Sequence, residues 1–406
     1  MTTEHDTPAQ RTRRSNGPAV LAQGFRPFFL LAGMWAAAAL AIFVATLEGR
    51  IELPTAFSPV NWHAHEMLFG YISAAIAGFL LTAIPNWTGR LPIHGVPLLG
   101  LALVWVAGRV AVAASERIGA GTAALIDLAF LFLLCAVTLR EIVAGRNWRN
   151  LPIILVIGVL LTLNALMHAE LIGLSEPEGV ARRGGVAMVI VLITLVGGRI
   201  VPSFTRNWLA KRNARSLPGG FGVVDRLTLA VTPAAFCVWA LRPDSGLTAG
   251  LCALAAALNL IRLIRWRGHQ THPEPLLWIL HLAYLWIPVG LGLIALSHWW
   301  PALPASGALH ALTSGAMGTM TLAVMSRTTL GHTGRALHAG QGLTAAYLCV
   351  TVATLLRILS GLSTDWDGPL LMAAALAWVA AFVLFLAVCG PMLVARRRDG
   401  DAGDAP

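Results

Sequence analysis

Three side chains that could do metal or proton chemistry stand together in the segment NWHAHEMLFGY at 61–71, directly before an apolar stretch. His63 and His65 offer imidazoles, which bind iron, copper or zinc as neutral ligands. Glu66 could bind the same ion, fix the tautomer of a neighbouring histidine or carry a proton. On an ideal helix the two histidines are about 200° apart, so they bind one ion only with distortion, or otherwise serve different partners.

Two further histidines are expected at the same depth as this first pair. His168, one helical turn after Asn164, and His310 both lie near the predicted outer ends of apolar stretches. Polar groups are expensive in lipid, and a single intramembrane histidine can still be a packing residue. Imidazoles from three helices at one depth favour a metal or heme site instead.

The remaining ionisable residues within the apolar stretches leave more than one interpretation open. His281 and His332 are expected near the inner ends of their stretches, as a separate inner pair. Arg199 could pair with a heme propionate or an acidic side chain, or could extend to the membrane interface as many arginines do. Arg109 and Asp127 could pair with each other or line a polar path.

The elements that must position these residues are membrane-spanning helices. The chain has 406 residues, of which 57% are hydrophobic and 12% charged, and its mean hydropathy is +0.71. A soluble domain carries about 25% charged residues. Apolar runs long enough to cross a core of about 30 Å recur along the chain. We predict an all-α bundle of twelve transmembrane helices at roughly 28–48, 60–84, 93–113, 120–140, 152–173, 184–202, 223–241, 246–266, 276–297, 306–326, 341–361 and 370–393.

The placement of charge predicts the orientation and excludes a nucleic-acid partner. Most of the 29 Lys and Arg residues fall in alternate loops, which places both termini in the cytoplasm. The net charge of +10 is spread over these loops without a basic face for nucleic acid. We expect a disordered cytoplasmic arm over 1–24, without a cleavable signal peptide, a single transmembrane domain over 25–395 and a cytoplasmic tail over 396–406. The five cysteines form no CxxC pair and are expected to be small core residues.

Small residues at four-residue spacing predict where helices approach closely. Ala74 and Gly78 lie in the second predicted span, and Ser314 and Gly318 lie in the tenth. This spacing lets backbones come together in a membrane. Since the same two spans carry histidines, we expect them in the middle of the bundle.

Seven blocks of the sequence resemble the NnrS family. They run in order from the first predicted span to the loop after the tenth: GFRPFFLLAG at 24–33, WHAHEMLFGY at 62–71, GFLLTAIPNWTGR at 78–90, NALMHAE at 164–170, GGRIVPSFTRN at 197–207, PLLWILHLAYLWIPVGL at 275–291 and HALTSGAMGTMTLAVMSRTTLGHTGR at 310–335. The resemblance implies a bacterial inner-membrane protein that contains heme and copper and acts in nitric oxide metabolism and nitrosative stress resistance. It also implies that the positions matching the family's ligand or proton-path residues are His63, His65, Glu66, His168, His281, His310 and His332.

Twelve spans with inward histidines also resemble, at the level of fold alone, the catalytic subunits of heme–copper oxidases and nitric oxide reductases. This chain lacks their adjacent His-His pair. The leading hypothesis is a nitric oxide reductase-like oxidoreductase with Glu66, His63 and His65 in catalytic roles. His63, His65, His168 and His310 would bind a second metal, either copper or non-heme iron.

In this hypothesis His168, His281, His310, His332 and Arg199 are the cofactor-binding candidates. The heme would be noncovalent heme b, because the chain has no CxxCH motif. Electrons would come from quinol or from a protein donor. Two alternatives stay open: a heme-based sensor or scavenger of nitric oxide without turnover, and an anion or metal transporter. The oligomeric state is left open.

Overall fold

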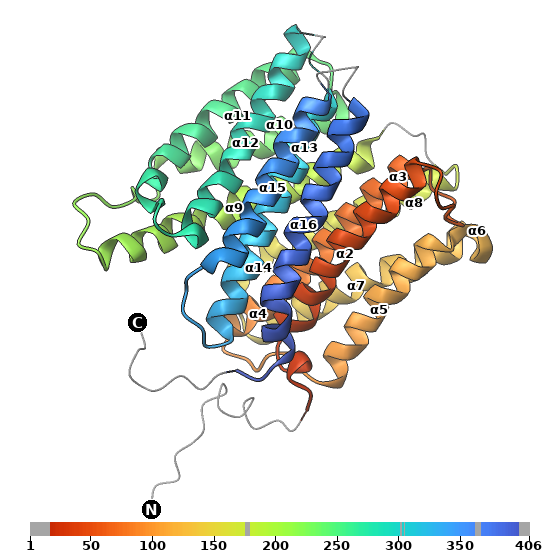
Figure 1. Ribbon diagram of the computed structural model, residues 1–406, viewed down its shortest axis with the longest axis horizontal. Coiled ribbons are helices and arrows are strands. Elements are labelled where there is room, and N and C mark those ends of the chain that lie inside the picture. The colour runs from red at the N-terminus through yellow and green to blue at the C-terminus, as the bar shows by residue number, and fades with distance from the viewer. Residues whose placement is uncertain (1–16, 175–178, 301–302, 304, 362–366, 398–406) are drawn as a thin grey trace, which may run out of the picture. The chain divides into compact units, whose positions relative to one another are not determined.

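The computed structural model describes residues 17–174, 179–300, 303, 305–361 and 367–397 (Figure 1). All elements in this part of the chain are helices. Twelve of them are long and apolar enough to cross a membrane, which confirms the predicted all-α, twelve-span fold. These spans are Phe25–Leu47, Pro59–Thr88, Val96–Ala113, Ala120–Ala144, Trp148–Leu171, Val180–Ala210, Val223–Leu241, Gly246–Ile264, Pro275–Trp299, Ala305–His332, Gly340–Ser360 and Gly368–Val394.

The helices group into two compact units, each with its own core. Unit 1 comprises residues 1–177, 328–336 and 386–406. Its principal helices are α2 (Phe25–Leu47), α3 (Pro59–His65), η2 (Glu66–Ile72), α4 (Ser73–Thr88), α5 (Val96–Ala113), α7 (Ala120–Ala144) and α8 (Leu151–Leu171), with the short α6 (Ser115–Ile118) and η3 (Trp148–Asn150) between them.

Unit 2 comprises residues 178–327 and 337–385. It contains α9 (Val180–Ala210), α10 (Val223–Leu241), α11 (Gly246–Ile264), η4 (Gly268–Thr271), α12 (Pro275–Trp299), α13 (Ala305–His310), η5 (Ala311–Gly318) and α15 (Gly340–Ser360). Most of α14 (Thr319–His332) and α16 (Asp367–Val394) also belongs to it. That the spans form one domain with both termini in the cytoplasm stays a prediction. Of the predicted arm and tail, residues 1–16 and 398–406 lie outside the described residues, and 17–24 include the turn η1 (Ala19–Leu21).

The second span starts where its sequence predicts. Ser58 is the extended N-cap residue and Pro59 occupies the first turn, where its missing N–H costs nothing. From Glu66 to Ile72 the backbone is a π-helix, and the α-helix resumes at Ser73. The tenth span has the same construction, because its π-helix Ala311–Gly318 directly follows His310. Such π segments are frequent at functional sites.

Close packing is observed at the glycine of each predicted small-residue pair. A Cβ atom on Gly78 would lie 2.6 Å from the ring of Phe29, and one on Gly318 would lie 2.5 Å from the ring of Trp378. In unit 1 this close packing holds the π segment of the second span against α2 and α5. The polar side chains of that segment therefore face protein rather than lipid.

Candidate metal centre

Six polar side chains from different helices of unit 1 meet in one buried cluster. They come from the end of α3, the start of η2, the last turns of α5, the first half of α7 and two successive turns of α8. Each residue is no more than 3% exposed. We call this group the buried cluster; its members are His65, Glu66, Arg109, Asp127, Asn164 and His168.

Asp127 is the centre of the buried cluster. Its Oδ2 atom accepts a hydrogen bond from Asn164 Nδ2 at 2.7 Å and one from His168 Nε2 at 3.1 Å. The same oxygen lies 3.2 Å from His65 Nε2. Its other oxygen, Oδ1, forms an ion pair with Arg109. This confirms pairing as the role of these two intramembrane charges, which the sequence had left open.

Glu66 holds His65 from the opposite side. Its Oε1 accepts from His65 Nδ1 at 3.0 Å, and its Oε2 accepts from Trp35 Nε1 at 2.7 Å and from Arg109 Nη1 at 3.1 Å. Arg109 thus bridges the two carboxylates. The bond from Nδ1 leaves Nε2 of His65 directed at Asp127 and at Asn164 Oδ1, which is 2.9 Å away.

The neighbours of His65 Nε2 require a cation at that point. Both oxygens facing this nitrogen are acceptors, so either a proton or a metal ion must stand between them and the ring. Formal charge leads to the same conclusion, because two carboxylates and one guanidinium leave the cluster one positive charge short of neutral. An uncompensated buried charge is strongly destabilising. The buried cluster therefore fits either an imidazolium or a bound cation.

Glycines give the buried cluster the room it needs. A Cβ on Gly70 would lie 2.5 Å from Arg109 Nη1, 2.7 Å from Trp35 Nε1 and 3.0 Å from Glu66 Oε2. A Cβ on Gly108 would lie 3.0 Å from Asp127 Oδ1. The Trp105 indole also donates to the carbonyl of Gly70 at 3.0 Å. The π segment and these two glycines together let the charged side chains approach one another.

Three members of the buried cluster could ligate a metal. His65, Asp127 and His168 each offer a donor atom, and these atoms lie within 4.8 Å of one another. In addition, Nδ1 of His168 is buried and has no hydrogen-bond partner among the described residues. A buried nitrogen without a partner is costly, but the nitrogen of His168 that faces Asp127 is Nε2, so the possible ligand set rests on Nε2 and not on Nδ1. Two imidazoles and one carboxylate are the donor set of non-heme iron(II) sites.

His63 and His310, which were predicted at the same membrane depth as His65 and His168, have different surroundings. The ring of His63 stacks on Phe43, with ring centroids 4.2 Å apart, and it is not among the three possible ligands. The two histidines of the WHAH motif therefore serve different partners, one of the two possibilities that helix geometry allowed. His310 belongs to unit 2, where its Nδ1 lies 2.8 Å from the carbonyl of Ser306. That His310 lies at the same membrane depth as His63, His65 and His168 stays a prediction.

The predicted inner pair and Arg199 contribute no side chain to the buried cluster. His281 is in unit 2, where its Nε2 lies 2.8 Å from Thr205 Oγ1. His332 is in unit 1 and packs its ring against Phe25, at 5.4 Å between centroids. Arg199 is exposed on α9, and its role stays a prediction.

A second buried polar network, in unit 2, was not predicted from the sequence. Arg262 donates to Asp225 Oδ1 at 2.8 Å and to the Tyr284 hydroxyl at 3.1 Å. That hydroxyl donates to Asn259 Oδ1 at 2.7 Å, and Asn259 donates to Thr232 Oγ1 at 2.9 Å. Asp225 and Arg262 lie near the ends of their spans and look interfacial by position alone. Only the tertiary contacts reveal that they are buried.

Comparison with known proteins agrees with the resemblance seen in the motifs. The family model described as NnrS protein matches residues 19–397. No curated protein matches the chain. The matched region runs from the turn before the first span to the end of the last, and it includes every member of the buried cluster. The protein therefore belongs to the NnrS family, and this membership suggests a role in nitric oxide-related metabolism.

Proposed function

We propose that this protein is a heme- and metal-containing oxidoreductase of the bacterial inner membrane that reduces nitric oxide to nitrous oxide. Two molecules of nitric oxide, two electrons and two protons give one nitrous oxide and one water. Quinol or a protein donor would supply the electrons. The observation that carries the proposal is the convergence of His65, Asp127 and His168 within 4.8 Å in a fully buried position.

The residues of this site fit a redox metal. The donor set favours non-heme iron over copper, because one of the three ligands is a carboxylate oxygen. A metal there would supply Lewis acidity and a template for the reacting oxygen or nitrogen atoms. Glu66 would hold the proton of His65 on Nδ1, which keeps Nε2 available as a ligand.

The other members of the buried cluster would manage charge and protons. Arg109 would hold the two carboxylates side by side, because its guanidinium bonds to both. Glu66 joins His65 to the bridging Arg109, so it is placed to hold a proton beside the metal ligands. Complete burial would exclude water and protect reactive intermediates.

The surroundings of His281 do not fit heme as they stand. Its Nε2 faces Thr205, and a Cβ on Gly268 would lie 2.5 Å from its Nδ1, so neither nitrogen faces an open space. Heme binding at this position would require η4 or α9 to move. Heme is therefore proposed on the family resemblance, and no step is assigned to it.

The test combines spectra, metal analysis and turnover of the purified full-length protein. We expect heme, one equivalent of a second metal, and nitrous oxide release when nitric oxide and an artificial reductant are added. His65→Ala and Asp127→Ala should lose the second metal and the activity. The matched control is His63→Phe, which preserves ring stacking on Phe43 and should retain the second metal.

The outcomes separate this proposal from its rivals. Heme and nitric oxide binding without nitrous oxide would identify a sensor or scavenger. Folded protein with neither heme nor metal would contradict a redox function and favour a transporter. Loss of metal in His63→Phe with retention in His65→Ala would refute the assignment of the ligands.

A further inference from the structure

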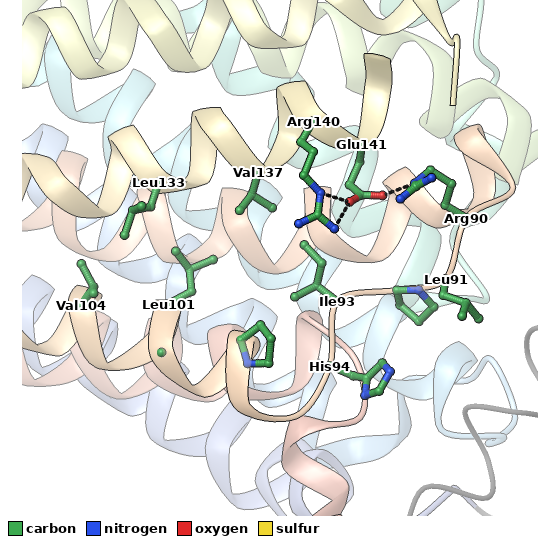
Figure 2. A pocket seen from close by; sticks show the side chains of 13 residues that line it. Arg90, Leu91, Ile93, His94, Leu101, Val104, Leu133, Val137, Arg140 and Glu141 are labelled. Atoms are coloured by element: carbon green, nitrogen blue, oxygen red, sulfur yellow. Dashed lines mark hydrogen bonds and ion pairs between the residues drawn. The ribbon is translucent and has the colours of Figure 1, made fainter. Parts of the chain in front are cut away.

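An apolar groove lies between the start of α5 and the end of α7, at the end of this helix pair that is remote from the buried cluster. It has a volume of about 830 Å³, within the range of small-molecule sites (Figure 2). The segment at 90–95, which joins α4 to α5, closes one end. The walls of the groove are formed by Pro97, Gly100, Leu101, Val104, Leu133 and Val137.

The closed end of the groove carries an excess of positive charge. Glu141 has a side chain only 5% exposed, and it pairs with Arg90 Nε at 2.5 Å and with Arg140 Nη2 at 3.0 Å. Figure 2 shows the two arginines approaching this carboxylate from opposite sides. Two guanidiniums against one carboxylate leave one net positive charge. Arg90 and Arg140 have side chains 40% and 71% exposed, so their remaining N–H groups can reach a ligand.

We infer that this groove is a binding site for one anionic phospholipid. An acyl chain would lie along the apolar wall between α5 and α7, and the phosphate would be bound by Arg90 and Arg140 at the end of the spans. Basic pockets between transmembrane helices bind anionic head groups in this manner. A neutral quinol would leave the excess positive charge unpaired, and a free phosphate ion would leave the apolar wall uncovered.

This position connects the lipid to the buried cluster. The helices that form the groove are those that carry the Arg109–Asp127 ion pair. Val104 is the groove residue of α5 nearest along the chain to Arg109, at about 7.5 Å along the helix axis. A lipid seated between α5 and α7 would hold these two helices together at one end, while the Arg109–Asp127 ion pair holds them together at the other. Removing the lipid should therefore loosen the packing of the two helices and the position of Asp127.

Gly100 offers a direct steric test, because a Cβ on this residue meets nothing within 4 Å. In Gly100→Phe the ring would fill the groove without a backbone clash. Gly158→Phe, on α8, is the matched control, since its Cβ also meets nothing within 4 Å and it does not line the groove. Arg140→Gln removes charge from the closed end while Arg90 still pairs with Glu141.

The experiment measures lipid retention by native mass spectrometry of the full-length protein, titrated in detergent with phosphatidylglycerol or with zwitterionic phosphatidylcholine. We expect wild type and Gly158→Phe to retain one phosphatidylglycerol. Gly100→Phe should lose it, and Arg140→Gln should bind about fivefold more weakly. Equal retention in Gly100→Phe, equal affinity for phosphatidylcholine, or a quinone in place of the phospholipid would overturn the proposal. None of these readouts depends on nitric oxide turnover.

Discussion

Replacing Arg109 by methionine should destabilise the protein more than any other single change in the buried cluster. The guanidinium bridges Glu66 and Asp127, and both carboxylates are buried. Methionine retains much of the apolar stem but removes the charge. The variant would leave two carboxylates against one cation on His65, so one buried negative charge would be uncompensated.

The magnitude follows from the burial of these groups. Removing one partner from a buried ion pair costs about 3–5 kcal/mol of unfolding free energy. Asp127→Asn should cost less, about 1–3 kcal/mol, because Arg109 still pairs with Glu66 and His65 can become neutral, so that no buried charge is left uncompensated and only hydrogen bonds are weakened. In the double variant Arg109→Met/Asp127→Asn, the remaining negative charge of Glu66 is balanced by the positive charge of His65, so the cluster is formally neutral again. We therefore expect it to be more stable than Arg109→Met alone.

The assay is unfolding by SDS in mixed micelles, followed by far-UV circular dichroism, for wild type, both single variants and the double variant. The cycle isolates the interaction between the two residues, because neither replacement adds a new charge. A double variant less stable than Arg109→Met, with costs that simply add, would refute the charge balance described for the buried cluster.

Two further predictions concern a glycine of unit 1 and the polar network of unit 2. Gly70→Ala should reduce the yield of folded protein and the metal content, because its Cβ would lie 2.5 Å from Arg109 Nη1. Gly158→Ala, whose Cβ meets nothing within 4 Å, should be tolerated, and normal metal content in both variants would contradict the packing argument. Tyr284→Phe removes the hydroxyl between Arg262 and Asn259 and should cost about 1–3 kcal/mol in the same unfolding assay. Its metal content should equal that of wild type, and a loss of metal would show that the unit 2 network supports the site.

The fold was predictable because each span is a predominantly apolar run bounded by charges, prolines or glycines. The start of the second span at Pro59 follows from one local signal. The sixth span extends to Ala210, beyond the predicted end at 202, because the helix continues past Pro202 through the mixed polar and aromatic residues 203–210. Hydropathy detects the apolar run, whereas the helix ends where its backbone hydrogen bonds end.

The candidate site was predictable only in part. His65, His168 and Glu66 were identified by residue type within apolar runs, and helix geometry allowed His63 to diverge from His65. The central position of Asp127 was not foreseen, because spans that are apolar on all sides do not reveal which face meets which neighbour. Trp35, which donates to Glu66, carried no signal beyond being an aromatic residue in a span.

The measurement that tests the central claim most directly is X-ray absorption at the edge of the metal found in the purified protein. The buried cluster predicts a first shell of nitrogen and oxygen only, with two imidazoles in wild type and one around any residual metal in His65→Ala or His168→Ala. Asp127→Ala should lose most of the metal. A thiolate in the first shell, or an unchanged first shell in all three variants, would show that the metal lies elsewhere and would contradict the account.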